Sequence, residues 1–230
     1  MTILRSPAAL LLGAALGAAA AHAGDVPKGF TPIWNGKDLT GWHRSQTNHH
    51  GTSTGWSVKD GVLLATQDRP GNGGILLTDR KYRDFEVSLE INPDWGCDGG
   101  LFLRSNEKGQ AYQVMIDYLE GGSVGGIYGE GLEGVTGGTG ERVNRDWAKH
   151  WKKGEWNALR ARIEGDVPRI QVWLNDAPLV DWTDSANHAA DGATEGMIAL
   201  QMHFSNEKTP RWKQGGFHRY RNVAVKELPR

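Results

Sequence analysis

The feature that most constrains the fold is a repeated alternation of apolar and polar residues in short runs. In the run 85–91 (FEVSLEI) every second residue is apolar, and the residues between them are polar. The same pattern recurs in the runs 112–118, 157–163, 170–174, 197–204 and 220–228. Side chains two residues apart project from one face of a strand, so each run can bury one face in a core.

The runs are separated by turn signals rather than by helical segments. Asn-Gly or Asp-Gly pairs occur at 35–36, 60–61, 72–73 and 98–99, and the chain contains 32 glycines. Such pairs favour the tight turns that join antiparallel strands. No internal repeat or linker is evident. The pattern therefore predicts one all-β domain, a sandwich of two antiparallel sheets.

The first 23 residues are typical of a secretory signal peptide. Arg5 is followed by an apolar stretch and then by Ala21-His22-Ala23, a small-x-small end. The apolar stretch is too short and too rich in Ala and Gly for a good membrane span. We therefore expect the signal at 1–23, the mature β-sandwich domain at 24–230, export to the periplasm or the medium, and no membrane attachment.

Charge and cysteine content exclude several classes of protein. The formal net charge of −1 includes no basic excess of the kind that nucleic-acid binding requires. Cys97 is the only cysteine, so the fold has no internal disulfide, and a metal site built on several thiolates is excluded. We interpret Cys97 as a small, semi-buried side chain in a turn rather than as a nucleophile.

Tryptophan is unusually frequent, with ten residues in the chain. Indole rings stack on the apolar faces of sugars, although a large β core can also use tryptophan for bulk. We expect most of the ten to be structural and one to three to lie at a carbohydrate site. Two long irregular segments, 120–156 and 205–217, are further candidates for a functional role, because long loops in compact domains are often functional.

Several polar residues fall on the outward phases of the predicted strands: Glu90, Arg104, Gln113, Asp117, Gln201 and His203. A merely solvated face would favour interchangeable Lys, Glu, Thr and Ser. This mixture of amides, carboxylates, an imidazole and a guanidinium is instead suited to binding hydroxyl groups and transferring a proton. His203 is the natural acid or base near neutral pH, unless it only bridges strands by hydrogen bonds.

Other site classes leave weaker traces. Neither HExxH nor His-x-His spacing is present, and His49, His50 and His188 lie in predicted loops, where they carry less signal. No cofactor is expected; a divalent metal is possible, but the sequence has no spacing that identifies its site. The chain also lacks a Gly-x-Ser-x-Gly elbow, a phosphate loop and a dinucleotide fingerprint.

The order of short motifs resembles the 3-keto-disaccharide hydrolase family, within the concanavalin-like lectin/glucanase superfamily. The matching segments run from one end of the predicted mature chain to the other: FTPIWNGKDLTGW (30–42), WSVKDGVL (56–63), GGILLTDRKYRDFEVSLE (73–90), GGLFLR (99–104), YQVMIDY (112–118), GGIYG (125–129), GEWNALRARIEG (154–165), VWLNDAPLVDW (172–182), GMIALQMHF (196–204) and YRNVAVKEL (220–228). The resemblance implies a jelly-roll sandwich with a sugar cleft on its concave sheet. It also implies a 3-keto-glycoside substrate that a separate sugar 3-dehydrogenase has oxidised beforehand.

The implied chemistry is a β-elimination, with possible hydration afterwards to give net hydrolysis. It needs a base for the C2 proton, a partner for the ketone oxygen and an acid for the leaving group. The resemblance implies His203 and Asp117 as the proton-transfer pair and Arg104 as the partner of the ketone or enolate oxygen. Hydroxyl-binding residues would be Glu90, Gln113, Tyr128 and Gln201. The segment 205–217 departs from the family pattern, and its Trp212 would contact the aglycone side.

Three functions remain open on the sequence. The first is the 3-keto-glycoside hydrolase or lyase, the second a non-catalytic sugar-binding module, and the third an ordinary glycosidase. The third needs two carboxylates across a cleft, for which Glu90 and Asp117 are the candidates. A shared pocket for His203 and Asp117 would favour the first function, and a His203 buried against backbone partners would favour the second.

Overall fold

The computed structural model describes residues 26–116, 119, 122–135 and 142–229. The predicted signal peptide and Asp117 lie outside the described residues, so both remain predictions. Within the described part, no helix has the length and apolar character to cross a membrane.

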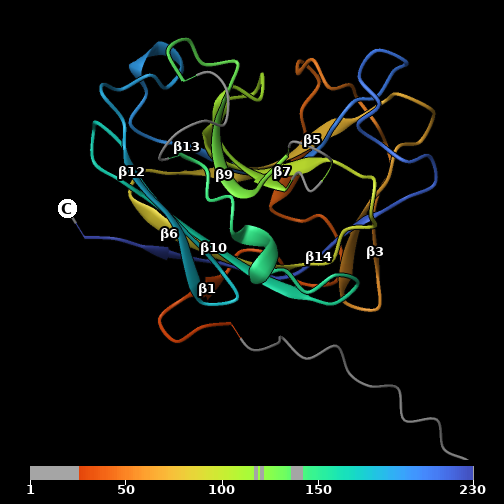
Figure 1. Ribbon diagram of the computed structural model, residues 1–230, viewed down its shortest axis with the longest axis horizontal. Coiled ribbons are helices and arrows are strands. Elements are labelled where there is room, and N and C mark those ends of the chain that lie inside the picture. Colours follow the sequence, from red (N-terminus) through yellow and green to blue (C-terminus); the bar gives the residue numbers. More distant parts are fainter. Residues whose placement is uncertain (1–25, 117–118, 120–121, 136–141, 230) are drawn as a thin grey trace, which may run out of the picture.

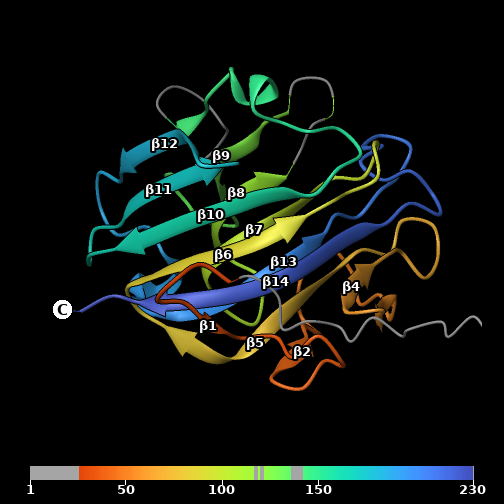
Figure 2. The ribbon, with the colours of Figure 1, turned by 90° about the horizontal axis from the view of Figure 1, so that it is seen from below.

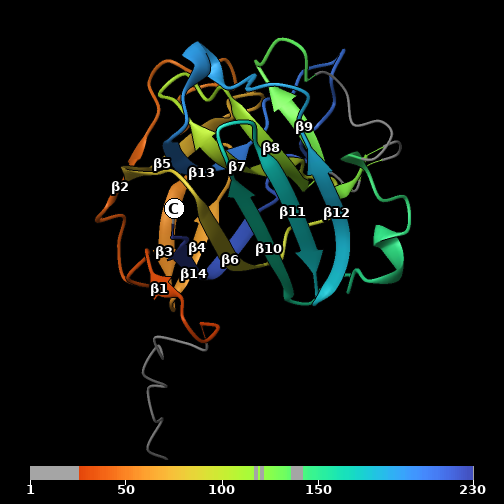
Figure 3. The ribbon, with the colours of Figure 1, turned by 90° about the vertical axis from the view of Figure 1, so that its left-hand side faces the viewer.

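The strands form two antiparallel sheets, which Figures 1 and 3 show as separate layers. One sheet has eight strands: β1 (Thr31–Pro32), β3 (Trp56–Lys59), β4 (Val62–Ala65), β6 (Phe85–Ile91), β10 (Asn157–Glu164), β11 (Arg169–Leu174), β12 (Ala177–Thr183) and β14 (His218–Glu227). The other has six: β2 (Trp42–Arg44), β5 (Gly74–Tyr82), β7 (Gly99–Ser105), β8 (Ala111–Ile116), β9 (Val124–Glu130) and β13 (Gly196–Met202). Among the described residues, two short 3-10 helices, η2 (Trp147–Lys149) and η3 (Ala190–Gly192), lie in connections.

The strand order crosses the sequence repeatedly. The eight-stranded sheet runs β12-β11-β10-β6-β14-β4-β3, with β1 paired to β14. Figure 2 shows β12, β11, β10, β6 and β14 side by side. The six-stranded sheet runs β2-β5-β13-β7-β8-β9. Neighbours such as β13 and β7 are far apart in the chain, so the outer face of the six-stranded sheet collects residues from distant segments. The predicted two-sheet antiparallel sandwich is confirmed.

The alternation places the core between the two sheets. Leu101 and Leu103 of β7 and Val114 of β8 face the eight-stranded sheet, where Val87 and Leu89 of β6 face them in turn; all five have at most 1% exposure. Burying a side chain of this kind contributes roughly 1.5–3 kcal/mol. With no disulfide among the described residues, this core carries the stability of the fold, as the sequence predicted.

Two hairpin turns show how the sequence selects the connections. Asp60 and Gly61 join β3 to β4 with φ angles of 51° and 75°, as the Asp-Gly signal predicted. Asn175 and Asp176 join β11 to β12 with φ angles of 49° and 66° and contain no glycine. Asn and Asp tolerate the left-handed region better than other side chains, so both pairs fit a two-residue turn in which both central φ angles are positive.

The outer face of the six-stranded sheet is divided in two. One half is a second apolar cluster of buried residues: Ile75, Leu77, Phe102, Ala111, Met197 and Ala199. The other half is polar and includes Gln113 on β8 and Gln201 on β13, with 5% and 0% exposure. Amides buried to this degree require hydrogen-bond partners. The polar residues that surround these two amides form a pocket.

Candidate active site

A polar pocket of about 320 Å³ opens on the outer face of the six-stranded sheet. Its lining comes from β8, β9, the loop before β7, the loop between β2 and β3, and the segment after β13: His49, Asp98, Gln113, Met115, Tyr128, Glu130, His203, Phe204, Thr209 and Arg211. The volume is at the lower end of the range for small-molecule sites, roughly 300–1,000 Å³. Three of the predicted site residues, Gln113, Tyr128 and His203, meet here.

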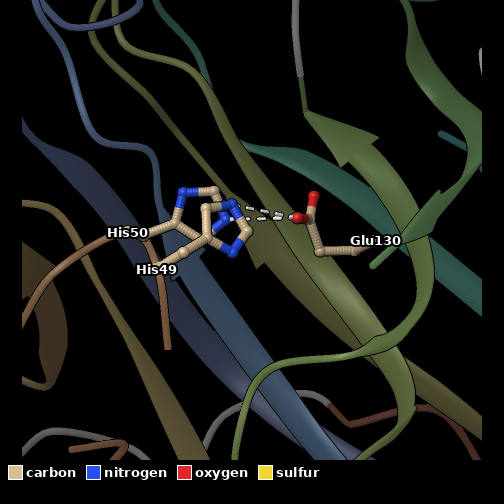
Figure 4. Close-up of side chains that lie close together, drawn as sticks. All are labelled: His49, His50 and Glu130. Atoms are coloured by element: carbon tan, nitrogen blue, oxygen red, sulfur yellow. Dashed lines mark ion pairs between the residues drawn. The ribbon is translucent and has the colours of Figure 1, made fainter. Parts of the chain in front are cut away.

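At one side of the pocket, two imidazoles point at one carboxylate (Figure 4). His49 Nε2 lies 3.2 Å from Glu130 Oε1, and His50 Nε2 lies 3.6 Å from the same oxygen. The histidines belong to the loop between β2 and β3, whereas Glu130 ends β9. The His50 side chain is fully buried and that of Glu130 is 10% exposed. Imidazole nitrogen and carboxylate oxygen are both common metal ligands.

A chain of amides leads from the sheet to this cluster. Gln113 Nε2 donates to Gln201 Oε1 at 3.0 Å, and Gln201 Nε2 donates to His50 Nε2 at 2.8 Å. The same nitrogen, His50 Nε2, also faces Glu130 Oε1. Gln201 therefore lies behind the pocket lining, where it orients His50.

His203 is oriented from its other side. Its Nδ1–H donates to the carbonyl oxygen of Phe204 at 2.6 Å, which leaves the lone pair on Nε2. The ring lies edge-on to His50, with centroids 4.8 Å apart. Burial lowers the pKa of His203 to about 4, and neighbouring His50 adds to the effect. A neutral imidazole with an unprotonated Nε2 can accept a proton.

The electrostatics of the cluster favour a neutral His49 imidazole and an ionised Glu130 carboxylate. Burial, together with the neighbouring His50, lowers the pKa of His49. Burial by itself would raise the pKa of Glu130, but the surrounding imidazoles, led by that of His50, outweigh it and the pKa is lowered.

The pocket lining also includes Asp98 and Arg211, a carboxylate and a guanidinium that approach to 4.0 Å. Asp98 also holds the segment after β13, because the His203 N–H donates to its carbonyl oxygen. Phe204, Thr209 and Arg211 line the pocket. Thr209 and Arg211 thus bring the irregular segment 205–217 to the pocket lining.

Arg104 does not lie in the pocket. Its guanidinium is fully buried and donates to the carbonyl oxygens of Arg83 and Gly165 and to Asp84 Oδ1, at 2.7, 2.9 and 2.8 Å. The reason is a bulge in β7: the pairing with β13 shifts register there, and Arg104 has a φ of 55°. A bulge re-aims a side chain, so the alternation from Leu103 does not continue to Arg104.

Glu90 and Trp212 also lie away from the pocket. Glu90 is on β6 of the other sheet, where Arg221 Nε and Nη2 donate to its two oxygens at 2.9 Å and Asn222 donates as well. Trp212 is 7% exposed and packs against the ring of His218. The alternation was read correctly for β6, but it cannot tell which of two sheets a strand joins. An ordinary glycosidase that uses Glu90 is not compatible with this position.

Sequence reasoning missed the cluster of His49, His50 and Glu130. The two histidines are adjacent in a loop with no periodicity, and Glu130 ends a glycine-rich strand 80 residues later. The only available signal was the His-His pair itself. Cys97 is buried, and burial raises the pKa of its thiol to about 12, which fits the structural interpretation made from the sequence.

Solved structures with the same fold come from several bacteria. A candidate glycosyl hydrolase from Parabacteroides distasonis is 20% identical, with a TM-score of 0.56 over 87% of this chain and 94% of that chain. The β-glucanase of Bacillus licheniformis is 10% identical, with a TM-score of 0.51 over 87% of this chain and 97% of that chain. At these identities the similarity shows the fold alone, and it confirms the predicted concanavalin-like jelly roll.

At the level of sequence, one family model matches most of the chain. It is described as a 3-keto-alpha-glucoside-1,2-lyase-like domain and covers residues 29–226. A comparison with curated proteins returned no match.

Proposed function

Because the chain belongs to the 3-keto-alpha-glucoside-1,2-lyase-like domain family, and is thus a carbohydrate-active, glycosyl hydrolase-like protein, we propose that it cleaves 3-keto-glycosides in the pocket on the six-stranded sheet. The observation that carries the proposal is the position of His203. This residue presents an unprotonated Nε2 in a polar pocket that also contains a guanidinium and an amide.

The reaction is a β-elimination. The C3 ketone acidifies the C2–H bond, because the electron pair left at C2 is delocalised onto the ketone oxygen as an enolate. His203 Nε2 accepts the C2 proton. The C1–O bond then breaks, its electron pair leaves with the aglycone oxygen, and that oxygen takes up a proton. Addition of water across the resulting C1=C2 bond yields the free 3-keto sugar and completes a net hydrolysis.

The remaining pocket residues bind the sugar. Gln113 and Tyr128 offer an amide and a phenol to ring hydroxyls, and Asp98 and Arg211 provide an acceptor and a donor in the same lining. Asp117, which the sequence suggested as the second proton-transfer residue, follows β8 directly and remains a candidate for the acid. Glu90, Arg104 and Trp212 are not part of the proposed site.

The substrate places the protein after an oxidation step. A glycoside with a C3 ketone has to be formed by a separate sugar 3-dehydrogenase, because the proposed elimination and hydration leave the net oxidation state of the sugar unchanged. We also propose that the chain is exported, on the basis of the signal-like residues 1–23.

The test compares a 3-keto-glucoside with its unoxidised parent and follows release of the aglycone. We expect release from the ketone only, and in D₂O we expect deuterium at C2 of the hydrated product. His203→Gln should lose at least about 100-fold in kcat/KM, the scale of general acid–base catalysis. The matched control is His43→Gln, whose imidazole contacts the carboxylates of Asp79 and Glu107 outside the pocket.

Two results would reject the proposal. Release from the parent glycoside but not from the ketone would contradict the elimination chemistry. A wild-type rate in His203→Gln would show that another group takes the C2 proton.

A further inference from the structure

We propose that His49, His50 and Glu130 form a binding site for one divalent transition-metal ion of the zinc class, at the side of the pocket. Among the described residues, these three are the group of histidine, cysteine and acidic side chains whose ligand atoms converge, all within 4.8 Å of one another. Two imidazole nitrogens and one carboxylate oxygen are a ligand set that zinc-class ions accept.

The distances suit a shared ion. Zinc lies about 2.0–2.2 Å from nitrogen and oxygen ligands, so two ligands of a tetrahedral site are about 3.4 Å apart. Glu130 Oε1 is 3.2 Å from His49 Nε2 and 3.6 Å from His50 Nε2, which brackets this value. Figure 4 shows both rings directed at that oxygen. The carboxylate oxygen is therefore at tetrahedral spacing from both imidazole nitrogens.

The charge of the cluster also favours a cation. Glu130 is 8% exposed, and the basic side chains that contact its carboxylate within the described residues are the imidazoles of His49 and His50, not an arginine or lysine. A buried carboxylate needs a compensating positive charge.

The ligands are also held in place before an ion arrives. Asn48 Oδ1 accepts hydrogen bonds from the backbone N–H groups of His50 and Gly51, at 2.9 and 3.2 Å, which fixes the loop. Gln201 Nε2 lies 2.8 Å from His50 Nε2 and so holds that ring in place, and an incoming ion would take the place of this contact.

The site has a role in the proposed reaction, and this part of the inference rests on the proposed function. Three protein ligands leave a fourth position for water or substrate, as catalytic zinc sites do. Glu130 and His49 both line the pocket, so the ketone oxygen of the sugar can take that position. A metal ion there would stabilise the enolate that Arg104 was predicted to stabilise.

Metal binding is tested first without substrate. Chelator-treated full-length protein is titrated calorimetrically with Zn²⁺, and with Co²⁺ while its visible absorption is followed. We expect one ion per chain and a four-coordinate cobalt spectrum. Glu130→Gln and His49→Gln should each weaken binding by at least about 100-fold, since even outer partners of ligands account for 10- to 100-fold. His43→Gln should bind as the wild type does, and urea unfolding verifies that the variants are folded.

Activity separates the two proposals. Chelator-treated protein should cleave the 3-keto-glucoside at least about tenfold more slowly and recover with Zn²⁺. Absence of binding in the wild type, or equal binding in both ligand variants, would overturn the site. A full rate in the metal-free protein would overturn its role in the reaction. If neither form cleaves the ketone, the proposed function fails while the binding result stands.

Discussion

Arg104 provides the sharpest test of the structure against the sequence, because the two assign it different roles. In the structure its side chain is fully buried and makes three hydrogen bonds, one of them to the carboxylate of Asp84. Removing one partner of a buried ion pair costs about 3–5 kcal/mol. Asp84 Oδ1 keeps the N–H of Gly165, and its Oδ2 lies 3.7 Å from Arg83 Nε, so its charge is not stranded. We therefore expect Arg104→Met to lower the free energy of unfolding by about 3 kcal/mol, the lower end of this range.

The measurement is the free energy of unfolding in urea, with the thermal midpoint as a second readout. For a domain of this size about 3 kcal/mol corresponds to a fall of roughly 6–12 °C. The matched control is Arg80→Met, whose exposed ion pair with Glu227 should contribute no more than about 1 kcal/mol. Well below its midpoint, Arg104→Met should still cleave the 3-keto-glucoside. Wild-type stability together with lost cleavage would refute this assignment and return Arg104 to the catalytic site.

The remaining predictions concern a buried histidine and a glycine. Burial lowers the pKa of His218 from 6.5 to about 4, so the unfolded chain is protonated first as the pH falls. His218 should contribute roughly 3 kcal/mol to the fall in the free energy of unfolding between pH 6.5 and 4. His218→Asn should therefore show a fall smaller than that of the wild type by about this amount, and an equal fall would contradict the prediction. In Gly100→Ala the new Cβ would lie 2.4 Å from Gln113 Nε2. Displacement of this pocket amide should lower kcat/KM by about 10- to 100-fold, and an unchanged value would count against a role for Gln113.

The candidate site was only partly predictable from the sequence, for reasons visible at individual residues. Gln113 and His203 were found because both follow the strand alternation to the outer face of the six-stranded sheet. Arg104 was misplaced because a bulge interrupts that alternation one residue earlier. Glu90 follows its own alternation correctly, but β6 pairs with β10 and β14 in the other sheet.

The sequence alone determined the class of fold, because alternation and turn residues act over a few positions and leave their trace in each run separately. It could not determine which runs become neighbours, since that depends on how all of the strands share one core. The cluster of His49, His50 and Glu130 is of this second kind. Its members acquire their proximity, their burial and their lowered pKa values only when β9 and the loop after β2 are brought together over one sheet, and no local pattern records that encounter.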